Sequence, residues 1–312
     1  MQFPDGKRFA FTILDDTDEA TLENVRPVYD RLRDLGFRTT KTVWPMDCPE
    51  GSPVYSSADT LQRRDYLEYV RSLADAGFEI ASHGATMEPS LRDRTVRGLD
   101  FLEREFGAVP RLHANHGHNT ENIYWGSERF RSPLIRPLIR LLGRHPRDEF
   151  TGEREESPHY WGDLCREHCD YVRNFTFADL DVLQHNPEMP YRLDSTPSVA
   201  HWFSTTDVPD AGVFRRRVHR AALERLEEAG GVCIVSTHLG KGFAPEGELD
   251  PVVDATLGYL AERPGWYVPV STLLDHLREQ GGAPGLGGLA LLRLELRFLV
   301  GQIRERLAGE LS

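Results

Sequence analysis

Mostly apolar runs alternate with amphipathic segments near the start of the chain. Phe9 to Leu14 is an apolar run that stops abruptly at two aspartates, which predicts a buried strand with a polar end. From Leu22 to Leu35 apolar residues recur at helical spacing, and Gly36 supplies a left-handed cap. Arg38 to Trp44 alternates and is rich in Thr and Val, which predicts a second strand. The chain therefore opens with a strand–helix–strand unit.

The same unit repeats along the chain. Helical spacing predicts further helices at Leu67 to Ala76, Leu91 to Phe106, Val213 to Ala229, Pro251 to Glu262 and Ser271 to Glu279. Further strands are predicted at Phe78 to Ser82, Arg111 to Asn115, Val232 to Thr237 and Trp266 to Val268. Strands alternating with helices are typical of parallel βα units, and no Gly-x-Gly-x-x-Gly follows the first strand to indicate a dinucleotide-binding fold. We therefore expect an α/β fold: a deformed (β/α) barrel of parallel strands, not necessarily complete.

Two parts of the chain depart from this pattern. Between residues 117 and 211 the periodicity breaks down, and Arg, Glu, Pro and His accumulate. We expect insertions over the barrel mouth there, together with one or two strands at Val172 to Phe177 and Tyr191 to Asp194. Residues 281–312 read as a Gly-rich linker and an amphipathic helix from Leu289 to Leu307. The barrel domain is accordingly expected to span residues 1–280.

The C-terminal helix has a wide apolar face that must be covered. It also carries four arginines in an otherwise acidic chain: Arg293, Arg297, Arg304 and Arg306. Folding back onto the barrel would cover the apolar face, but the barrel pattern is already complete by about Leu277. We therefore expect self-association through this helix or contact with an anionic membrane surface.

Composition narrows the class of protein. A chain of 312 residues with 39% hydrophobic residues can bury one large core. Its net charge of −12 argues against a nucleic-acid partner, because phosphate backbones select Lys and Arg. No secretory signal is visible, and no apolar segment reaches the roughly 20 residues that span a bilayer. Four scattered cysteines are too few for a disulfide scaffold, so a cytoplasmic protein is expected.

Aspartates and histidines collect at the predicted strand ends. Asp15 and Asp16 follow the first strand, and His83 follows Phe78 to Ser82. The cluster His113 to His118 lies at the end of the next strand, and His238 follows Val232 to Thr237. In an α/β barrel these ends converge on the face that carries the active site. Asp and His together are suitable ligands for Zn²⁺ or a similar divalent ion.

The two adjacent aspartates can have different roles. Near a strand end the side chains of Asp15 and Asp16 diverge, so one can bind a metal while the other stays free as a base. The alternative is that both only favour the start of the next helix electrostatically. Thr17 and Asp18 are better placed for that task.

These segments resemble the motifs of a known family. The strand ending in Asp15–Asp16, followed by Gly77 to His83 (GFEIASH), is similar to the first two motifs of polysaccharide deacetylases of the chitooligosaccharide-deacetylase type. Ile234 to His238 looks like the late motif with the catalytic histidine, and the segment from Trp266 looks like the closing strand and helix. The resemblance implies an irregular barrel that removes acetyl from an N-acetylated sugar or a cell-surface polysaccharide intermediate.

The resemblance also implies roles for individual residues. Asp15 would be the general base that activates water, and His238 the general acid that protonates the leaving amine. Asp16 and His83 would bind a divalent transition metal, with Zn²⁺ the first choice and Co²⁺, Ni²⁺ or Fe²⁺ as alternatives.

The chain departs from the family pattern at the second metal histidine. Four residues after His83 the family usually has His, and this chain has Met87. The next motif, normally carrying Arg and Pro, reads RLHANHGHN from residue 111. A metal held by two ligands would be weakly bound, so we expect His116 to replace the missing ligand, with His113 and His118 as alternatives. The expected carbohydrate contacts are His113, Asn115, His118 and Trp44.

Two other functions remain open. A related metal hydrolase could cleave another amide or C–N bond on the same barrel, because fold does not dictate reaction. A non-catalytic carbohydrate-binding barrel would explain Met87. The joint presence of Asp15, Asp16, His83 and His238 argues against this last function, because a degenerate site has no reason to keep both base and acid.

Overall fold

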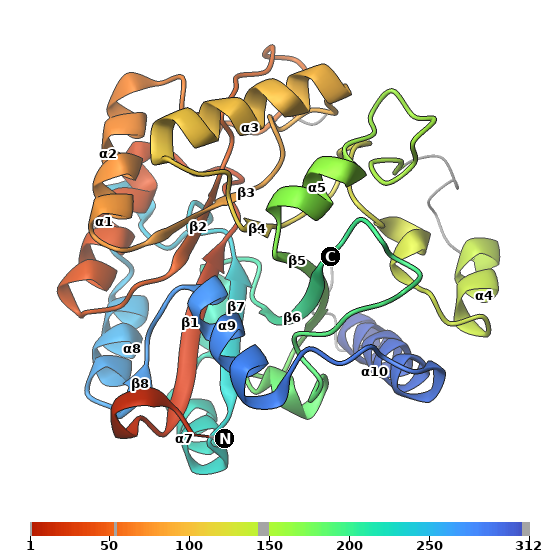
Figure 1. Ribbon diagram of the computed structural model, residues 1–312. Helices are drawn as coiled ribbons and strands as arrows, with labels where there is room; N and C mark the ends of the chain where they lie inside the picture. The colour runs from red at the N-terminus through yellow and green to blue at the C-terminus, as the bar shows by residue number, and fades with distance from the viewer. Residues whose placement is uncertain (1, 53–54, 143–149, 308–312) are drawn as a thin grey trace.

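A closed barrel of seven parallel strands forms the centre of the computed structural model, which describes residues 2–52, 55–142 and 150–307 (Figure 1). The strands are β1 (Phe9–Asp15), β2 (Thr40–Val43), β3 (Glu79–Ser82), β4 (Leu112–His113), β5 (Tyr171–Phe177), β6 (His201–Asp207) and β7 (Val232–Thr237). They pair in chain order from β2 to β7, and β1 closes the barrel by pairing with both β7 and β2. The expected (β/α) barrel is confirmed.

The barrel is deformed at β1, where one edge of the strand serves two partners. Phe9 and Ala10 pair with the short strand β8 (Gly265–Trp266), whereas Leu14 and Asp15 pair with β2. The contact between β1 and β2 is therefore confined to the carboxyl end of β1, where the candidate site lies.

Helices cover most of the outside of the barrel. The α-helices of the described ranges are α1 (Leu22–Asp34), α2 (Arg64–Asp75), α3 (Arg92–Phe106), α4 (Ile135–Leu142), α5 (Gly162–His168), α6 (Ala211–Arg217), α7 (Arg220–Ala229), α8 (Pro251–Ala261), α9 (Val270–Gly281) and α10 (Gly288–Leu307). Alternate residues of β1 show the two environments of a strand. Phe9, Phe11 and Ile13 share a core with the covering helices, and Ala10 and Leu14 belong to the core that fills the barrel.

The segment predicted as one long helix, Val213 to Ala229, is two helices. Val218 leaves the helical conformation (φ −93°, ψ 60°) at the end of α6. His219 then starts α7, and its Nδ1 accepts a hydrogen bond from the Ala222 N–H at 3.4 Å. The single-helix prediction was wrong because helical spacing of apolar residues continues across the break.

The segment between 117 and 211 contains one strand as predicted and one that was not. β5 falls where Val172 to Phe177 was expected, but β6 was missed. Tyr191 to Asp194 is not a regular strand, because Tyr191 makes only an isolated antiparallel bridge with Trp202.

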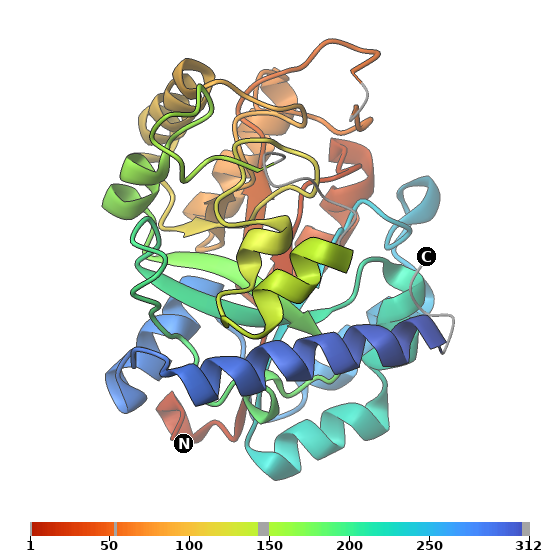
Figure 2. The ribbon, with the colours of Figure 1, turned by 90° about the vertical axis from the view of Figure 1, so that its right-hand side faces the viewer.

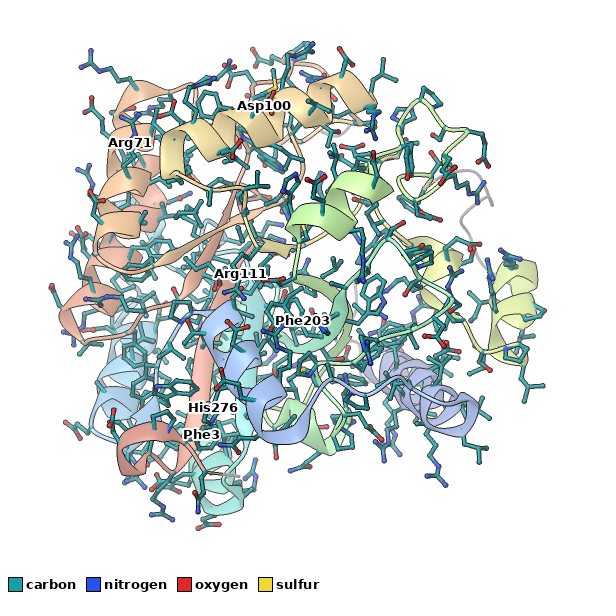
Figure 3. The ribbon with its side chains drawn as sticks, viewed as in Figure 1. Phe3, Arg71, Asp100, Arg111, Phe203 and His276 are labelled. Atoms are coloured by element: carbon teal, nitrogen blue, oxygen red, sulfur yellow. The ribbon has the colours of Figure 1, made fainter. Side chains whose placement is uncertain are left out.

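The amino end of the barrel is filled by apolar and aromatic side chains. Phe203 lies in the barrel core, and Phe3 and His276 lie beside each other with ring centroids 6.0 Å apart (Figure 3). Phe3 also packs against Trp266 of β8, which pairs with the start of β1. This leaves the carboxyl end as the open face.

The C-terminal helix α10 covers the outer face of β5 (Figure 2). The connection from β5 to β6 contains no α-helix, only the short 3₁₀ helix η3 (Val182–Gln184). Leu291, Leu294 and Phe298 of α10 fill that place and are buried in one core with Phe175. The helix thus folds back onto the barrel, and the expectation that the barrel is complete by about Leu277 was wrong.

The opposite side of α10 remains exposed. Leu296, Val300 and Ile303 have 45%, 44% and 57% of their surface accessible. Self-association or membrane-surface contact through this side stays a prediction. In the described ranges, no helix is long and apolar enough to cross a bilayer.

Candidate active site

A tight turn after β1 brings Asp18 over the mouth of the barrel. The Ala20 N–H donates to the Thr17 carbonyl at 3.0 Å, and Glu19 between them has a left-handed φ of 58°. The Asp18 carboxylate consequently lines the central cleft.

The turn is held against the loop after β7 by a close backbone approach at Gly240. A Cβ atom at this position would lie 2.4 Å from the Glu19 carbonyl oxygen and 2.7 Å from the Ala20 nitrogen. Only glycine allows this approach. The loop that carries Asp18 and the loop that follows His238 are therefore in direct contact.

Neither Thr17 nor Asp18 caps the next helix, contrary to expectation. Thr21 is the N-cap of α1: its Oγ1 accepts from the Asn24 N–H at 3.3 Å, and Asn24 Oδ1 accepts from the Thr21 N–H at 2.8 Å. This capping box satisfies the start of the helix without Asp18.

Three imidazoles surround the Asp18 carboxylate. The Nε2 atoms of His83, His116 and His238 lie 3.2, 3.0 and 3.5 Å from its oxygens. These histidines follow β3, β4 and β7, so the expected convergence of strand ends holds for all three.

The other ring nitrogen of each histidine is already hydrogen-bonded to an oxygen. The Nδ1 distances are 2.8 Å for His83 to Ala114 O, 3.0 Å for His116 to Asn119 Oδ1 and 2.7 Å for His238 to Pro209 O. Because these oxygens accept, Nδ1 carries a proton in each ring, so in a neutral ring the Nε2 lone pair would face Asp18. Two such electron-rich atoms repel each other unless a proton or a cation lies between them.

The electrostatics show that the cluster attracts positive charge. Burial alone would raise the pKa of Asp18, but hydrogen bonds from His116, His238 and His83 hold it well below its usual range. Burial would lower the pKa of His116 and of His238, yet Asp18 raises both above the ordinary value. A divalent cation bound between these groups would supply the same positive charge beside Asp18 as the protonated imidazoles do.

The donor set fits such a cation. In the described ranges no group of three or more His, Cys, Asp or Glu side chains encloses an ion as it stands, because Asp18 contacts the imidazoles directly. The three distances from the imidazole nitrogens to the Asp18 oxygens are nevertheless close to the roughly 3.3 Å edge of a tetrahedron with bonds of about 2.0–2.1 Å. Nδ1 groups donating to oxygen acceptors are also typical of metal-binding histidines. Asp18, His83 and His116 could therefore hold a metal after small shifts.

Asp16 lies beside the cluster and is paired with Arg173 of β5. The Arg173 Nη1 lies 2.9 and 2.7 Å from the two Asp16 oxygens and also donates to the Ser236 hydroxyl. The nearest contact of Asp16 with His83 is 4.0 Å, to Nδ1. Asp16 is thus oriented by an arginine that no sequence motif had marked.

Asp15 points away from the cleft, toward the helices. Its Oδ2 accepts from Lys41 Nζ at 2.9 Å and from the Tyr29 hydroxyl at 2.8 Å, and its Oδ1 accepts from the Leu239 N–H at 2.8 Å. The side chains of Asp15 and Lys41 are fully buried. The expectation that Asp15 is the base is therefore wrong: consecutive strand residues face opposite sides, and of Asp15 and Asp16 only Asp16 reaches the cleft.

Two expected substrate contacts are buried behind the cleft. His113 lies 3.2 Å from Ser82 Oγ and 3.1 Å from Asn115 Oδ1, and burial lowers its pKa to about 3. Trp44 is inaccessible, and its Nε1 donates to the His83 carbonyl at 3.2 Å. Both position their neighbours and cannot touch a sugar, so these two assignments are corrected.

Asn115 and His118 do line the cleft. Asn115 is buried and its side chain is hydrogen-bonded to the backbone of Ile123, whereas His118 is exposed at the rim. Met87 is buried and its Sδ accepts from the Ser56 N–H at 3.0 Å, so this position sends no ligand into the cleft.

The cleft has a volume of about 360 Å³, within the range of small-molecule sites. Its further lining residues are Gly117, Trp125, Arg129, Thr176, Asp207, Pro209, Ser236 and Lys241. Burial raises the pKa of Asp207 above its ordinary value. Most of these residues lie between 117 and 211, where the sequence pattern could not place them.

Solved structures share this fold, whereas no family model and no curated protein matches the sequence. A protein from Mycobacterium smegmatis, provisionally named a polysaccharide deacetylase, aligns at a TM-score of 0.55 and 16% identity over 92% of this chain and 96% of its own. A second such protein, from Pseudomonas aeruginosa PAO1, gives 0.54 and 13% over 90% and 94%. Puue allantoinase gives 0.51 and 13% over 90% and 93%. The expected resemblance to polysaccharide deacetylases is confirmed for the fold.

Proposed function

We propose that this protein is a metal-dependent hydrolase that removes an acetyl group from an N-acetylated sugar or a cell-surface polysaccharide intermediate. The observation that carries the proposal is the convergence of three imidazoles on Asp18, beside the Asp16–Arg173 pair. The choice of an acetyl amide rests on the family resemblance, since fold alone does not name a reaction. The proposal includes a cytoplasmic location, which rests on the sequence.

Asp18, His83 and His116 would hold the metal, with Zn²⁺ first and Co²⁺, Ni²⁺ or Fe²⁺ as alternatives. The chemistry such an ion supplies is polarisation of the amide carbonyl and a lower pKa of water. The sequence predicted Asp16, His83 and His116 as ligands. The proposed set retains the two histidines and replaces Asp16 by Asp18.

Asp16 is the proposed general base. It takes the proton of the water that attacks the carbonyl carbon, while Arg173 orients the carboxylate through charge-assisted hydrogen bonds. Asp16 is suited to this role because its contact with His83 is long, at 4.0 Å.

His238 is the proposed general acid. Its Nδ1 donates to the Pro209 carbonyl, so the protonated imidazolium, which Asp18 favours, delivers its second proton from Nε2, which faces the cleft. As the C–N bond breaks, that proton goes to the nitrogen of the leaving amine. Its side chain is 21% exposed, which leaves it accessible to substrate.

A hydrolase acting on another C–N bond is the second candidate. The observation that favours it is the alignment of an allantoinase with most of this chain. The same base, acid and metal ligands would serve either reaction.

Release of amine from N-acetylglucosamine oligomers by zinc-loaded protein tests the proposal, with allantoin as the second substrate. Asp16→Asn should lower the rate by about 10²–10⁴-fold, because it removes the base. Asp100→Asn, at an exposed position of α3, should not change it. Turnover of allantoin alone would favour the second candidate, and equal rates for the wild type and Asp16→Asn would contradict both.

A further inference from the structure

One cationic side chain that lines the cleft, Arg129, has no acidic partner among the described residues. Arg129 lies at the end of η2 (Gly126–Arg129) and lines the cleft. Across the described ranges, no carboxylate lies within 4.0 Å of its guanidinium. This holds also for Asp207, which lines the same cleft. Two further basic side chains line the cleft, and each has a carboxylate partner. Arg173 Nη1 lies 2.7 Å from Asp16 Oδ2, and Lys241 Nζ lies 3.8 Å from Glu19 Oε1.

The guanidinium is fixed on one side by the backbone of β5. Arg129 Nε lies 3.3 Å from Asn174 Oδ1, and Nη2 donates to the Asn174 carbonyl. That carbonyl is available because the pairing of β5 with β6 shifts register between Arg173 and Thr176. Within the described part of the chain, no residue accepts a hydrogen bond from Nη1.

Aromatic rings enclose the same group. The guanidinium carbon lies 4.2 Å from the centre of the Trp125 ring and 5.2 and 5.1 Å from those of Phe175 and Phe298. Burial lowers the pKa of Arg129 to about 9, which leaves it charged at neutral pH. Stacking offsets part of the cost of burying this charge but offers Nη1 no acceptor.

We propose that Arg129 binds an anionic group of the substrate, a carboxylate or a phosphate, while Trp125 contacts the sugar. The inference rests on the proposed function and narrows its substrate class to acidic N-acetylated sugars. A guanidinium suits this task because its planar N–H groups match the oxygens of either anion. Because Asn174 binds Nε and Nη2, Nη1 is the guanidinium nitrogen that remains, among the described residues, to donate to such an anion.

A purely structural role makes a different prediction. If Arg129 only joined β5 to α10 through Phe298, its replacement would lower stability without changing which sugars bind. The test must therefore measure selectivity as well as stability.

Binding of three sugars by calorimetry separates these roles. The probes are N-acetylglucosamine, N-acetylmuramic acid, which adds a carboxylate, and N-acetylglucosamine 6-phosphate. The variants are Arg129→Gln, Arg129→Lys and, as a control, Arg140→Gln, which removes a charge bonded to Glu128 outside the cleft. Each is measured as purified and after chelation of metal, so that an anion held only by metal is recognised.

The wild type should bind at least one anionic sugar about tenfold or more tightly than the neutral one, as expected for a hydrogen bond to a charged group. Arg129→Gln should lose this preference, Arg129→Lys should keep part of it, and Arg140→Gln should keep all of it. Equal binding of the three sugars, no measurable binding, or a preference that survives in Arg129→Gln would overturn the inference. Amine release, measured separately, reports on the proposed hydrolysis. Preference for an anionic sugar without release of amine would contradict the proposed hydrolysis but not the binding role of Arg129.

Discussion

Three aspartates close together in the sequence have three different environments. Asp15 forms a buried ion pair with Lys41, Asp16 is paired with Arg173 in the cleft, and Asp18 lies among the imidazoles. The first is structural, whereas the other two can meet a substrate or an ion. This division gives each aspartate a different measurable role.

Asp15→Asn should destabilise the protein by roughly 3 kcal/mol, because it leaves the buried Lys41 ammonium without a counter-charge. Asp16→Asn should cost less, because Asn can still accept from Arg173 at the edge of the cleft. Urea unfolding measures both free energies. If Asp15→Asn is as stable as the wild type, the buried ion pair with Lys41 does not stabilise the fold.

Gly240→Ala should weaken metal binding by about tenfold or more, because the added Cβ pushes on the turn that carries Asp18 and misplaces a ligand by a fraction of an ångström. Gly258→Ala is the control, since its Cβ would meet only Arg31 Nη2 at 3.8 Å. Competition with a zinc chelator measures the affinity. Equal affinities of the two variants would show that the close approach does not position Asp18.

At the scale of elements, α10 takes the place of the helix missing after β5. Phe298→Ala should destabilise the protein by roughly 3 kcal/mol, because Phe298 is buried against Phe130 and Phe175. Leu296→Ala on the exposed side should change stability by no more than about 0.5 kcal/mol. Thermal unfolding and light scattering of both variants test the two sides of α10. A lower mass for Leu296→Ala alone would indicate self-association through the exposed side.

The elements that the sequence predicted are those with clear apolar periodicity. β1 and β7 are continuous apolar runs, and α1 has one apolar face. β6 was missed because its buried positions include Ser204, Thr205 and Thr206, so neither an apolar run nor alternation marks it.

The candidate site was predicted in part. His83, His116 and His238 follow strands, and strand ends converge in any parallel barrel. Asp18 could not be recognised because an acidic residue before a helix looks like a cap, and the turn at Glu19 that redirects it depends on tertiary contact with Gly240. Arg129 and Arg173 line the same cleft but come from two separate segments of the chain, which no local pattern reveals.

At the scale of the whole molecule, the site joins the loops after β1, β3, β4 and β7. A metal shared by three of these loops should stabilise the folded barrel, by about 2.7 kcal/mol at 100 times its dissociation constant. Zinc should therefore raise the melting temperature of chelator-treated wild type. Asp18→Asn should remove most of that increase, and an undiminished increase in this variant would place the ion elsewhere.

The most direct test of the account is the number of metal ions per chain after zinc loading and dialysis. The wild type and Asp16→Asn should each retain close to one ion, because Asp16 is the proposed base and not a proposed ligand. Asp18→Asn and His116→Gln should retain almost none, because each removes a donor from the cluster. Retention of zinc by Asp18→Asn at the wild-type level, or a wild type that binds none, would contradict the proposed site.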